Sequence, residues 1–342
     1  MTRWGENDKA IARSILAHFH LQTKTNMKKE FLGLCAFASL MFVSCAQDEA
    51  NFCPDNEIEA SFTVEAPVGL QTRAIGDGTN ANVVACAVFD SKGNEMTKLR
   101  NNTLPITGKK ATYSVRLVKG QAYRIAFFAY NNQANAYDVT DMKNIKILDN
   151  QQTNVEGRDA FTVYMDVTSD ETMNKLTKDT ILYRPFAQLN LGALAEDITA
   201  AADAGVVVEK TQITISDVYT AFNAYEDAVV GTTTSRTFTW NTLPTEDLSA
   251  NGSTYDYLAM NYILVGDKEN PKSLSNVKFQ WETKNGEKTN NPVTEFKNVP
   301  VQRNYRTNIM GYLLTNPADF NITIDEKFKN PDYNPNLDDL LK

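Results

Sequence analysis

The residue with the clearest chemical setting in this sequence is Cys45, within the stretch SLMFVSCAQDEANFCP. Together with Ser44 it follows a run of 13 apolar or small residues, Phe31 to Val43, and a short basic start, Met27-Lys28-Lys29, precedes that run. The run is shorter than the ~20 residues that a membrane-spanning helix needs. A basic start followed by a short apolar core is typical of a secretory signal peptide, so this pattern predicts export.

The residues around the cysteine indicate lipid attachment. Phe42-Val43-Ser44-Cys45 resembles a bacterial lipobox, although Phe42 stands where leucine is usual. The resemblance implies cleavage between Ser44 and Cys45 and acylation of the cysteine, and two or more acyl chains give stable anchoring. The alternative is an ordinary cleaved signal peptide in front of an unmodified cysteine. We expect translation to start at Met27, which makes 1–26 a non-native extension, 27–44 the signal peptide and 45–58 a tether.

An acidic stretch, Gln47-Asp48-Glu49, follows the cysteine. It resembles the signal that sends lipoproteins of Bacteroidota to the outer face of the outer membrane. The alternative is a solvated tether with no sorting role. The prediction is a lipid-anchored protein of the outer membrane, exposed at the cell surface.

Processing makes the chain more acidic. The full chain has 34 basic and 42 acidic side chains, and residues 1–44 hold six of the former and three of the latter. The mature chain of 298 residues therefore has 28 against 39, a net charge of −11. Such a balance disfavours nucleic-acid binding, which depends on neutralising phosphates, and disfavours electrostatic docking on anionic lipids.

The mature chain contains no histidine, because His18 and His20 both lie before the signal peptide. This excludes Ser–His–Asp and Cys–His nucleophilic sites and leaves no material for common zinc sites. Two carboxylates could still serve a glycosidase, but no acidic residue has a sequence setting that indicates a raised pKa. Gly76-Asp77-Gly78-Thr79-Asn80-Ala81 loosely fits a dinucleotide-binding motif, yet a strand rather than a helix follows it. We expect no enzymatic activity and no cofactor.

Two cysteines remain after processing, Cys53 and Cys86. They could pair in an oxidising compartment, although two thiols do not imply a disulfide framework. Cys86 lies in VVACAVFD, where it is expected to be a small buried residue of a strand.

The rest of the chain is patterned as β structure. In TYSVRLV the residues Tyr113, Val115 and Leu117 share one face, the period of a half-buried strand, whereas RIAFFAY is apolar for so long that it predicts a central strand covered on both faces. Asn285-Gly286 is the strongest hairpin signal. One helix is predicted at Ala193 to Ala204, ended by Gly205.

Many short strands separated by turns predict sandwiches or barrels, and the length predicts two domains. We expect an all-β fold with an N-terminal β-sandwich domain at 59–182 and a C-terminal one, carrying the short helix, at 183–326. The polar stretch Thr168 to Thr180 is the expected linker, and 327–342 the expected flexible tail.

Several segments resemble fimbrillin-like lipoproteins of Bacteroidota, relatives of type V pilins. In the first half these are TRAIGDGTNANVVACAVFDSKGNEM and YRIAFFAYN. In the second half they are YRPFAQLNL, AEDITAAADAGVVVEKTQITI, VYTAFNAYEDAVV, YLAMNYILV and VPVQRNYRTNIMGYLLT. The resemblance covers most of Ala60 to Asp325 and keeps the order of the segments. It implies two tandem transthyretin-like β-sandwich (Greek-key) domains, a structural or adhesive role in or near a pilus, and other pilus subunits or host or bacterial surface ligands as partners.

The resemblance also implies a mechanism of assembly. In such pilins an arginine-specific protease removes the N-terminal strand, and a strand of a neighbouring subunit fills the exposed groove by β-augmentation. The matching bond here joins Arg73 to Ala74 in LQTRAIGDG, and cleavage would remove ASFTVEA together with the lipid. The alternative is that Arg73 is an ordinary exposed arginine in a loop.

Three further expectations stay open. FNITID alternates like a donor strand but can equally complete its own domain, and the tail FKNPDYNPNLDDLLK does not alternate. A monomeric glycan-binding lipoprotein is the alternative function, with sugars stacked on Trp240 or Trp281. Asp179-Thr180-Ile181 resembles the O-glycosylation signal of these bacteria, which makes Thr180 a candidate modification site.

Overall fold

The computed structural model describes residues 56–67, 76–245, 247–250, 253–266, 270–284, 294–316 and 319–325. Residues 53–342 form one compact unit. The predicted extension, signal peptide, lipidation site and tail all lie outside the described residues. Strand formation begins at Glu57, so the last two residues of the predicted tether already belong to the fold.

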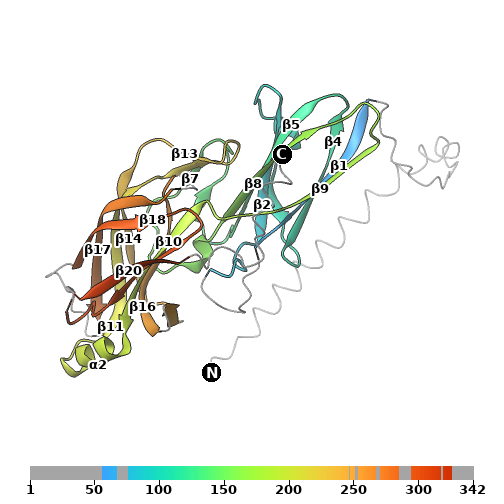
Figure 1. Cartoon of the computed structure of the whole chain (residues 1–342). Helices are drawn as coiled ribbons and strands as arrows, with labels where there is room; N and C mark the ends of the chain where they lie inside the picture. The colour runs from blue at the N-terminus through green and yellow to red at the C-terminus, as the bar shows by residue number, and fades with distance from the viewer. Residues whose placement is uncertain are drawn as a thin grey trace, which may run out of the picture. The chain divides into compact units, whose positions relative to one another are not determined.

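The described chain is almost entirely β structure, which confirms the predicted fold class (Figure 1). The first β-sandwich packs a three-stranded sheet against a four-stranded sheet around one buried core. In sheet order, the three-stranded sheet is β4 (Lys110–Val118), β1 (Glu57–Glu65) and β9 (Lys175–Ile181). The four-stranded sheet is β3 (Asn101–Pro105), β2 (Val83–Asp90), β5 (Ala122–Tyr130) and β8 (Phe161–Thr168).

The second β-sandwich has a five-stranded and a four-stranded sheet around a second core. The five-stranded sheet is β15 (Asp247–Ala250), β16 (Ser253–Leu264), β10 (Phe186–Leu194), β19 (Arg306–Gly311) and β20 (Phe320–Asp325). The four-stranded sheet is β14 (Thr234–Thr242), β11 (Val208–Val218), β17 (Lys272–Thr283) and β18 (Thr294–Val301). Strands β17 and β18 pair antiparallel as the hairpin signal predicts, and the turn itself lies outside the described residues.

The predicted helix is confirmed as α2 (Ala195–Asp203). Its alanine-rich sequence has high intrinsic helix propensity, and Glu196 and Asp197 lie in the first turn, where they interact favourably with the helix dipole. Gly205 follows with a φ of +81°, a left-handed conformation that glycine adopts without a Cβ clash. Two short 3-10 helices, η1 (Thr97–Leu99) and η2 (Glu156–Arg158), complete the helical segments of the described chain.

A fifth sheet joins segments from the two halves of the sequence. Its order is β13 (Ala228–Val230), β12 (Ala221–Asn223), β7 (Ile145–Ile147) and β6 (Tyr137–Asp138). Aromatic rings from both halves of the sequence pack together beneath it. The Phe128 ring centroid lies 5.3 Å from that of Tyr137 and 6.5 Å from that of Phe222. Hydrogen bonds and core contacts therefore cross residue 182, and the division into two domains at that point stays a prediction.

Strand β5 has the two-sided cover that its apolar run predicts. Ile125 and Phe127 face the first core, while Ala126 and Phe128 face the core beneath the fifth sheet. The predicted linker, in contrast, is wrong. Thr168 ends β8, and 175–180 belong to β9, which pairs in parallel with β1 along its whole length, so the polar residues of β9 line the exposed edge of a sheet.

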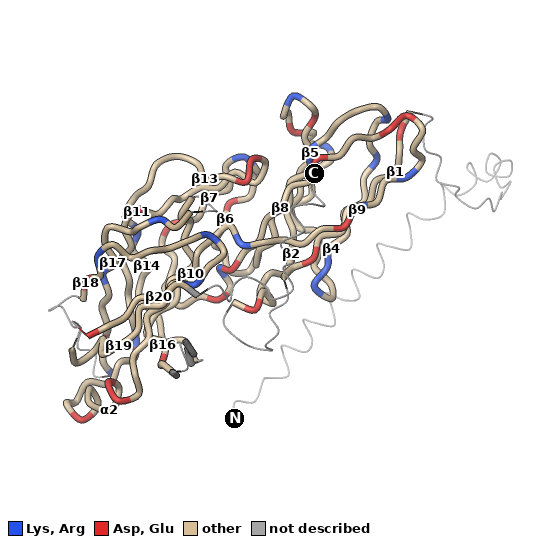
Figure 2. The backbone as a smooth tube through the Cα atoms, in the orientation of Figure 1, with Lys and Arg blue, Asp and Glu red and all other residues tan. Residues whose placement is uncertain are grey.

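No helix in the described part of the chain is long and apolar enough to cross a membrane. Lysine and arginine alternate with aspartate and glutamate over both sandwiches (Figure 2).

Candidate functional site

Strand β1 is the candidate site, because it is the first strand of the described chain and the central strand of its sheet. It pairs antiparallel with β4, where Phe62 lies opposite Tyr113, and in parallel with β9, where Phe62 lies opposite Lys178. Figure 1 shows the three strands side by side. Both edges of β1 are therefore satisfied by other strands, and its removal would open a slot with two unpaired strand edges.

One face of β1 contributes to the first core. Ile58, Ala60, Phe62 and Val64 are each no more than 2% exposed, while the residues between them are partly exposed. This alternation is the period of a strand with one buried face. The inward side chains pack with those of the facing sheet, so the slot that β1 occupies is apolar on its inner side.

Backbone hydrogen bonds hold both ends of β1. The Lys119 amide donates to the Asn56 carbonyl at 2.8 Å, and at the other end the Leu182 amide donates to the Glu65 carbonyl at 2.9 Å. Just beyond the strand, the Ala66 amide donates to the Lys109 carbonyl at 2.9 Å.

The covalent link from β1 to the rest of the sandwich runs through residues 68–75. Arg73 and Ala74, the predicted cleavage site, lie within this segment and outside the described residues. The described residues on either side of the segment lie close together, because a Cβ added to Gly78 would be 2.9 Å from the Pro67 carbonyl oxygen. A cut within this segment would leave β1 held by its backbone pairing and its buried face alone.

The loop that follows the predicted cut is fixed to a buried charged cluster. The Gly76 amide donates to Glu156 Oε2 at 3.2 Å, and the Asn80 side-chain amide donates to the same oxygen at 3.3 Å. Arg184 donates to the Gly76 carbonyl. Between these points, the Thr79 amide donates to Asp77 Oδ1 at 2.8 Å and closes a local turn.

The centre of this cluster is an ion pair between Arg184, at the start of the second half, and Asp159, just after η2. Arg184 Nε and Nη2 each donate to an Asp159 oxygen at 2.8 Å, with side-chain exposures of 4% and 1%. The Arg184 guanidinium also lies over the Phe161 ring, 4.7 Å from its centroid. Two-pronged pairing of this geometry fixes both side chains and satisfies charges that would be costly to bury alone.

Glu156 occupies the same cluster, where its Oε2 accepts hydrogen bonds from the Gly76 amide and the Asn80 side chain. Burial raises the pKa of the Glu156 carboxyl to about 7, and the nearby Asp159 adds to the shift. The Gly76 amide and Arg184 act in the opposite direction. Sequence inspection missed this group, because no residue beside Glu156 in the sequence indicates its burial.

We expect the pKa shift of Glu156 to appear in the pH dependence of stability. Between the ordinary carboxyl pKa and the folded value of about 7, the folded chain binds more protons than the unfolded chain. The free energy of unfolding therefore falls as pH rises through this window. Glu156→Gln should remove a contribution of up to about 3 kcal/mol, so its stability relative to the parent should rise from pH 4.5 to pH 8.

Urea unfolding of the lipid-free mature chain at pH 4.5, 6 and 8 measures this effect. Glu209→Gln, at an exposed position on β11, is the matched control and should keep the slope of the parent. Parallel stability curves for Glu156→Gln and the parent would contradict the assignment.

Asp159 pairs with Arg184, and Arg303 donates to Asp227 in a second buried pair. No group of three or more metal-ligating side chains occurs in the described part of the chain.

The remaining predicted residues have varied surroundings. Trp281 is 5% exposed and packs against Phe279, with ring centroids 5.6 Å apart, so it is a core residue and cannot stack a sugar. Trp240 is partly buried on β14. Thr180 is partly buried near the end of β9, and its glycosylation stays a prediction.

Cys86 is fully buried in β2, as predicted, and burial raises the pKa of its thiol to about 12. Cys53 lies outside the described residues, as do Ser44, Cys45 and the acidic stretch Gln47-Asp48-Glu49.

FNITID forms β20, which pairs with β19 at the edge of its own sheet. Ile322 packs against the second core, and the Phe320 ring lies 4.9 Å from that of Phe296. This strand therefore completes its own sandwich.

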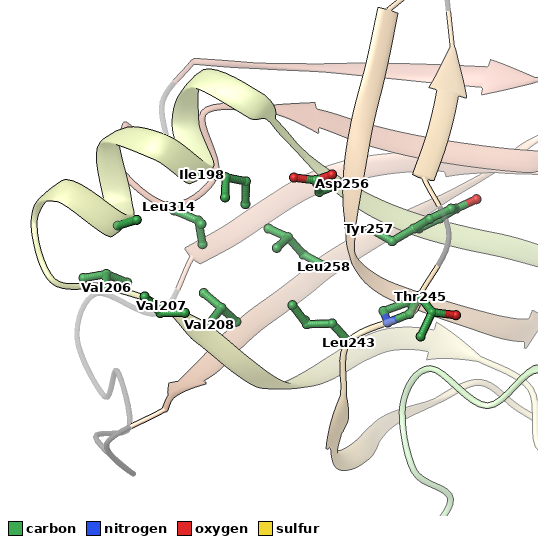
Figure 3. A pocket seen from close by; sticks show the side chains of 12 residues that line it. Ile198, Val206, Val207, Val208, Leu243, Thr245, Asp256, Tyr257, Leu258 and Leu314 are labelled. Carbon is green, nitrogen blue, oxygen red and sulfur yellow. The ribbon is translucent and has the colours of Figure 1, made fainter.

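A separate apolar pocket of about 250 Å³ lies beneath α2 (Figure 3). Its lining includes Ile198 from the helix, Val206 and Val208 from the following segment, and Leu258 from β16. Asp256 is the only ionisable carboxylate among the lining residues, which does not provide the pair that glycoside hydrolysis needs.

Comparison with known proteins gives one family match. The model of a family described as "Family of unknown function (DUF6562)" matches residues 52–340. No curated protein matches the chain.

Several solved structures are similar at low identity. A candidate cell adhesion protein from Bacteroides uniformis has 14% identity and a TM-score of 0.43, covering 78% of this chain and 99% of its own. A candidate polysaccharide-binding protein from Bacteroides thetaiotaomicron has 10% identity and a TM-score of 0.43, with 78% and 96% covered. A fimbrial assembly protein from Parabacteroides distasonis has 12% identity and a TM-score of 0.38, with 79% and 100% covered.

Proposed function

This chain belongs to the family described as "Family of unknown function (DUF6562)", and we propose that it is a surface lipoprotein related to fimbrial subunits, in which β1 is a replaceable strand. The observation that carries the proposal is the position of β1. It is the first strand of the described chain, it is paired on both edges, and it fills an apolar slot. A strand of another subunit with the same alternation could take its place by β-augmentation.

Cleavage after Arg73 would make this exchange possible. Before the cut, β1 is tied to the sandwich through residues 68–75, so a competing strand must overcome an intramolecular partner of very high effective concentration. After the cut, β1 would be held by hydrogen bonds and side-chain burial alone. A strand of a neighbouring subunit then competes with a β1 that no longer has the advantage of a covalent link.

The proposed lipid lies on the same side of the cut as β1. Cys45 precedes β1 by 12 residues, a span of at most about 43 Å when fully extended. A nicked subunit would remain on the outer membrane for as long as β1 stays in its slot. Strand exchange would release the body from the lipid and join it to a neighbour in a single step.

The mass of the mature N-terminus, measured on protein from its native envelope, tests this proposal. A fraction with a free N-terminus at Ala74, together with an acylated peptide that begins at Cys45, would support cleavage and exchange. Native material in which every Arg73–Ala74 bond is intact would overturn the exchange mechanism and leave a permanently tethered lipoprotein.

Replacing the proposed lipidation site should change the location of the protein. We expect Cys45→Ser to abolish acylation and to shift the protein from the membrane fraction to the soluble fraction, because the acyl chains supply the anchoring energy. Radiolabelled palmitate incorporation and membrane fractionation measure the two effects. Cys53→Ser is the matched control and should leave both unchanged. Unaltered acylation of Cys45→Ser would contradict the assignment.

A further inference from the structure

We propose that Arg158 and Arg236 form a buried binding site for a small monovalent anion of the size of chloride. Arg158 is the last residue of η2, in the first half of the chain, and Arg236 lies on β14, in the second half. Both residues are buried, with exposures of 1% and 8%. Neither belongs to β1 or to its sheet, so the inference is independent of the proposed strand exchange.

Arg158 is a buried cation with unpaired hydrogen-bond donors. Its Nη2 donates to the Tyr262 carbonyl at 3.0 Å, while Nε and Nη1 have no hydrogen-bond partner in the part of the chain that the structure describes. The guanidinium therefore donates to no described carboxylate. Burial lowers the pKa of the Arg158 guanidinium to about 10, which still leaves it charged at neutral pH. A buried charge without a partner of opposite sign is strongly destabilising, so a counter-ion is expected.

A second cation lies close to Arg158. The Cζ atoms of Arg158 and Arg236 lie 4.4 Å and 5.8 Å from the centroid of the same ring, Phe238, so they are at most 10.2 Å apart. After burial, repulsion by Arg236 is a further cause of the lowered pKa of Arg158. An anion between the two guanidinium groups would replace this repulsion by two attractions.

The polar contacts of Arg236 leave room for such an anion. Its guanidinium donates to the backbone carbonyls of Leu148 and, at 3.4 Å, of Ile147. Asp149 lies 3.7 Å from Nη2, but its side chain is 93% exposed, so water screens this pair. Arg236 is therefore held in position mainly by neutral carbonyl groups.

The neighbouring phenols do not neutralise the two cations. The Tyr137 hydroxyl donates to the Arg158 carbonyl, and the Tyr262 hydroxyl donates to Glu156 Oε1 at 3.4 Å. Burial raises the pKa of both phenols, so both stay uncharged at neutral pH. The cluster around Phe238 thus contains two positive charges and neutral neighbours, which is a setting that a small anion stabilises.

Binding of the anion would tie the two halves of the chain together. An ion that accepts from both guanidinium groups joins η2 to β14, and it binds the folded chain but not the unfolded one. At an anion concentration of 100 times Kd, a single site of this kind multiplies the ratio of folded to unfolded chain by about 100.

Urea unfolding in mixtures of sodium chloride and sodium gluconate tests the inference on the lipid-free mature chain. The total salt is kept at about 0.5 M, so that the screening of exposed charges stays constant. Gluconate is too large for a site enclosed by buried side chains. We expect the logarithm of the folded-to-unfolded ratio to rise with the logarithm of the chloride concentration, with a slope that approaches one.

Two variants locate the effect. Arg158→Met keeps much of the side-chain volume without the charge and should abolish the chloride dependence. Arg124→Met, which removes an arginine paired with the exposed Asp166, is the matched control and should keep the slope of the parent. An unchanged slope in Arg158→Met would overturn the inference.

Diffraction from crystals grown in sodium bromide gives a second readout that needs no variant, so the test holds even where Arg158→Met does not fold. Bromide resembles chloride in charge and size and scatters anomalously. We expect an anomalous peak within contact distance of the Arg158 and Arg236 guanidinium groups. Stability of the parent that does not depend on chloride would overturn the inference, and so would the absence of this peak. A peak without chloride-dependent stability would mean an adventitious ion only, which also overturns it.

Discussion

Phe62→Ala is expected to lower the free energy of unfolding of the mature chain by about 3–5 kcal/mol. Phe62 is fully buried on the inner face of β1, and its ring contributes to the first core between two sheets. Truncation removes apolar surface and leaves a cavity that paired strands on both sides cannot easily close. Equilibrium unfolding in urea measures the change.

The same substitution should have a larger effect on how tightly the nicked chain retains β1. In the nicked chain, β1 is held without a covalent tie, so the lost burial energy lowers its affinity directly. A loss of about 3 kcal/mol corresponds to roughly a 150-fold weaker association. Size-exclusion chromatography of the nicked protein, with a synthetic peptide of residues 56–67 as competitor, would follow this exchange.

Ser61→Ala is the matched control for Phe62→Ala, because Ser61 is the adjacent β1 residue and points away from the core. Its effect should stay within about 0.5 kcal/mol. Equal effects of the two substitutions would mean that β1 is not held by its buried face, and the replaceable-strand proposal would fail with it.

The second large effect is expected at the buried ion pair. Asp159→Asn or Arg184→Met alone should cost about 3–5 kcal/mol, because each leaves a charge in the protein interior without its partner. Arg184 exposes 4% and Asp159 1% of the side chain, so water cannot replace the missing partner. The double variant should be more stable than the sum of the single effects predicts, since it removes both charges together.

An exposed pair offers a close control. Arg124 and Asp166 form a similar two-pronged contact at 2.6 and 2.7 Å, but the Asp166 side chain is 61% exposed. Asp166→Asn should cost no more than about 1 kcal/mol. Additive effects of Asp159→Asn and Arg184→Met in a double-mutant cycle would show that the two charges are not coupled.

Local patterns in the sequence were sufficient to predict the fold class and several elements. Unbroken apolar composition identified β5 as a strand covered on both faces, and alanine content followed by Gly205 identified α2. These features depend on side-chain period and backbone propensity, which are written in neighbouring residues. Phe62 and Val64 in ASFTVEA alternate with polar residues, and both are buried in β1.

The partners of each strand were decided only by the tertiary structure. Polar composition made residues 168–180 look like a linker, yet β9 is stabilised as a strand by backbone pairing with β1, more than 100 positions earlier. Composition cannot report such pairing, because backbone hydrogen bonds do not depend on side-chain type. The fifth sheet likewise forms by backbone pairing between residues far apart in the sequence, around 145 and around 222.

The sequence by itself thus determined an all-β chain, and it predicts export and a candidate cut at Arg73. Tertiary structure alone decided that the loop after this cut ends on Glu156, Asp159 and Arg184, residues that are 80 to 108 positions away from Gly76 along the chain. Burial of these charges arises where the two halves of the chain pack together. The pKa shifts and the ion pairing of these residues arise from that packing, so no local pattern of residues could have encoded them.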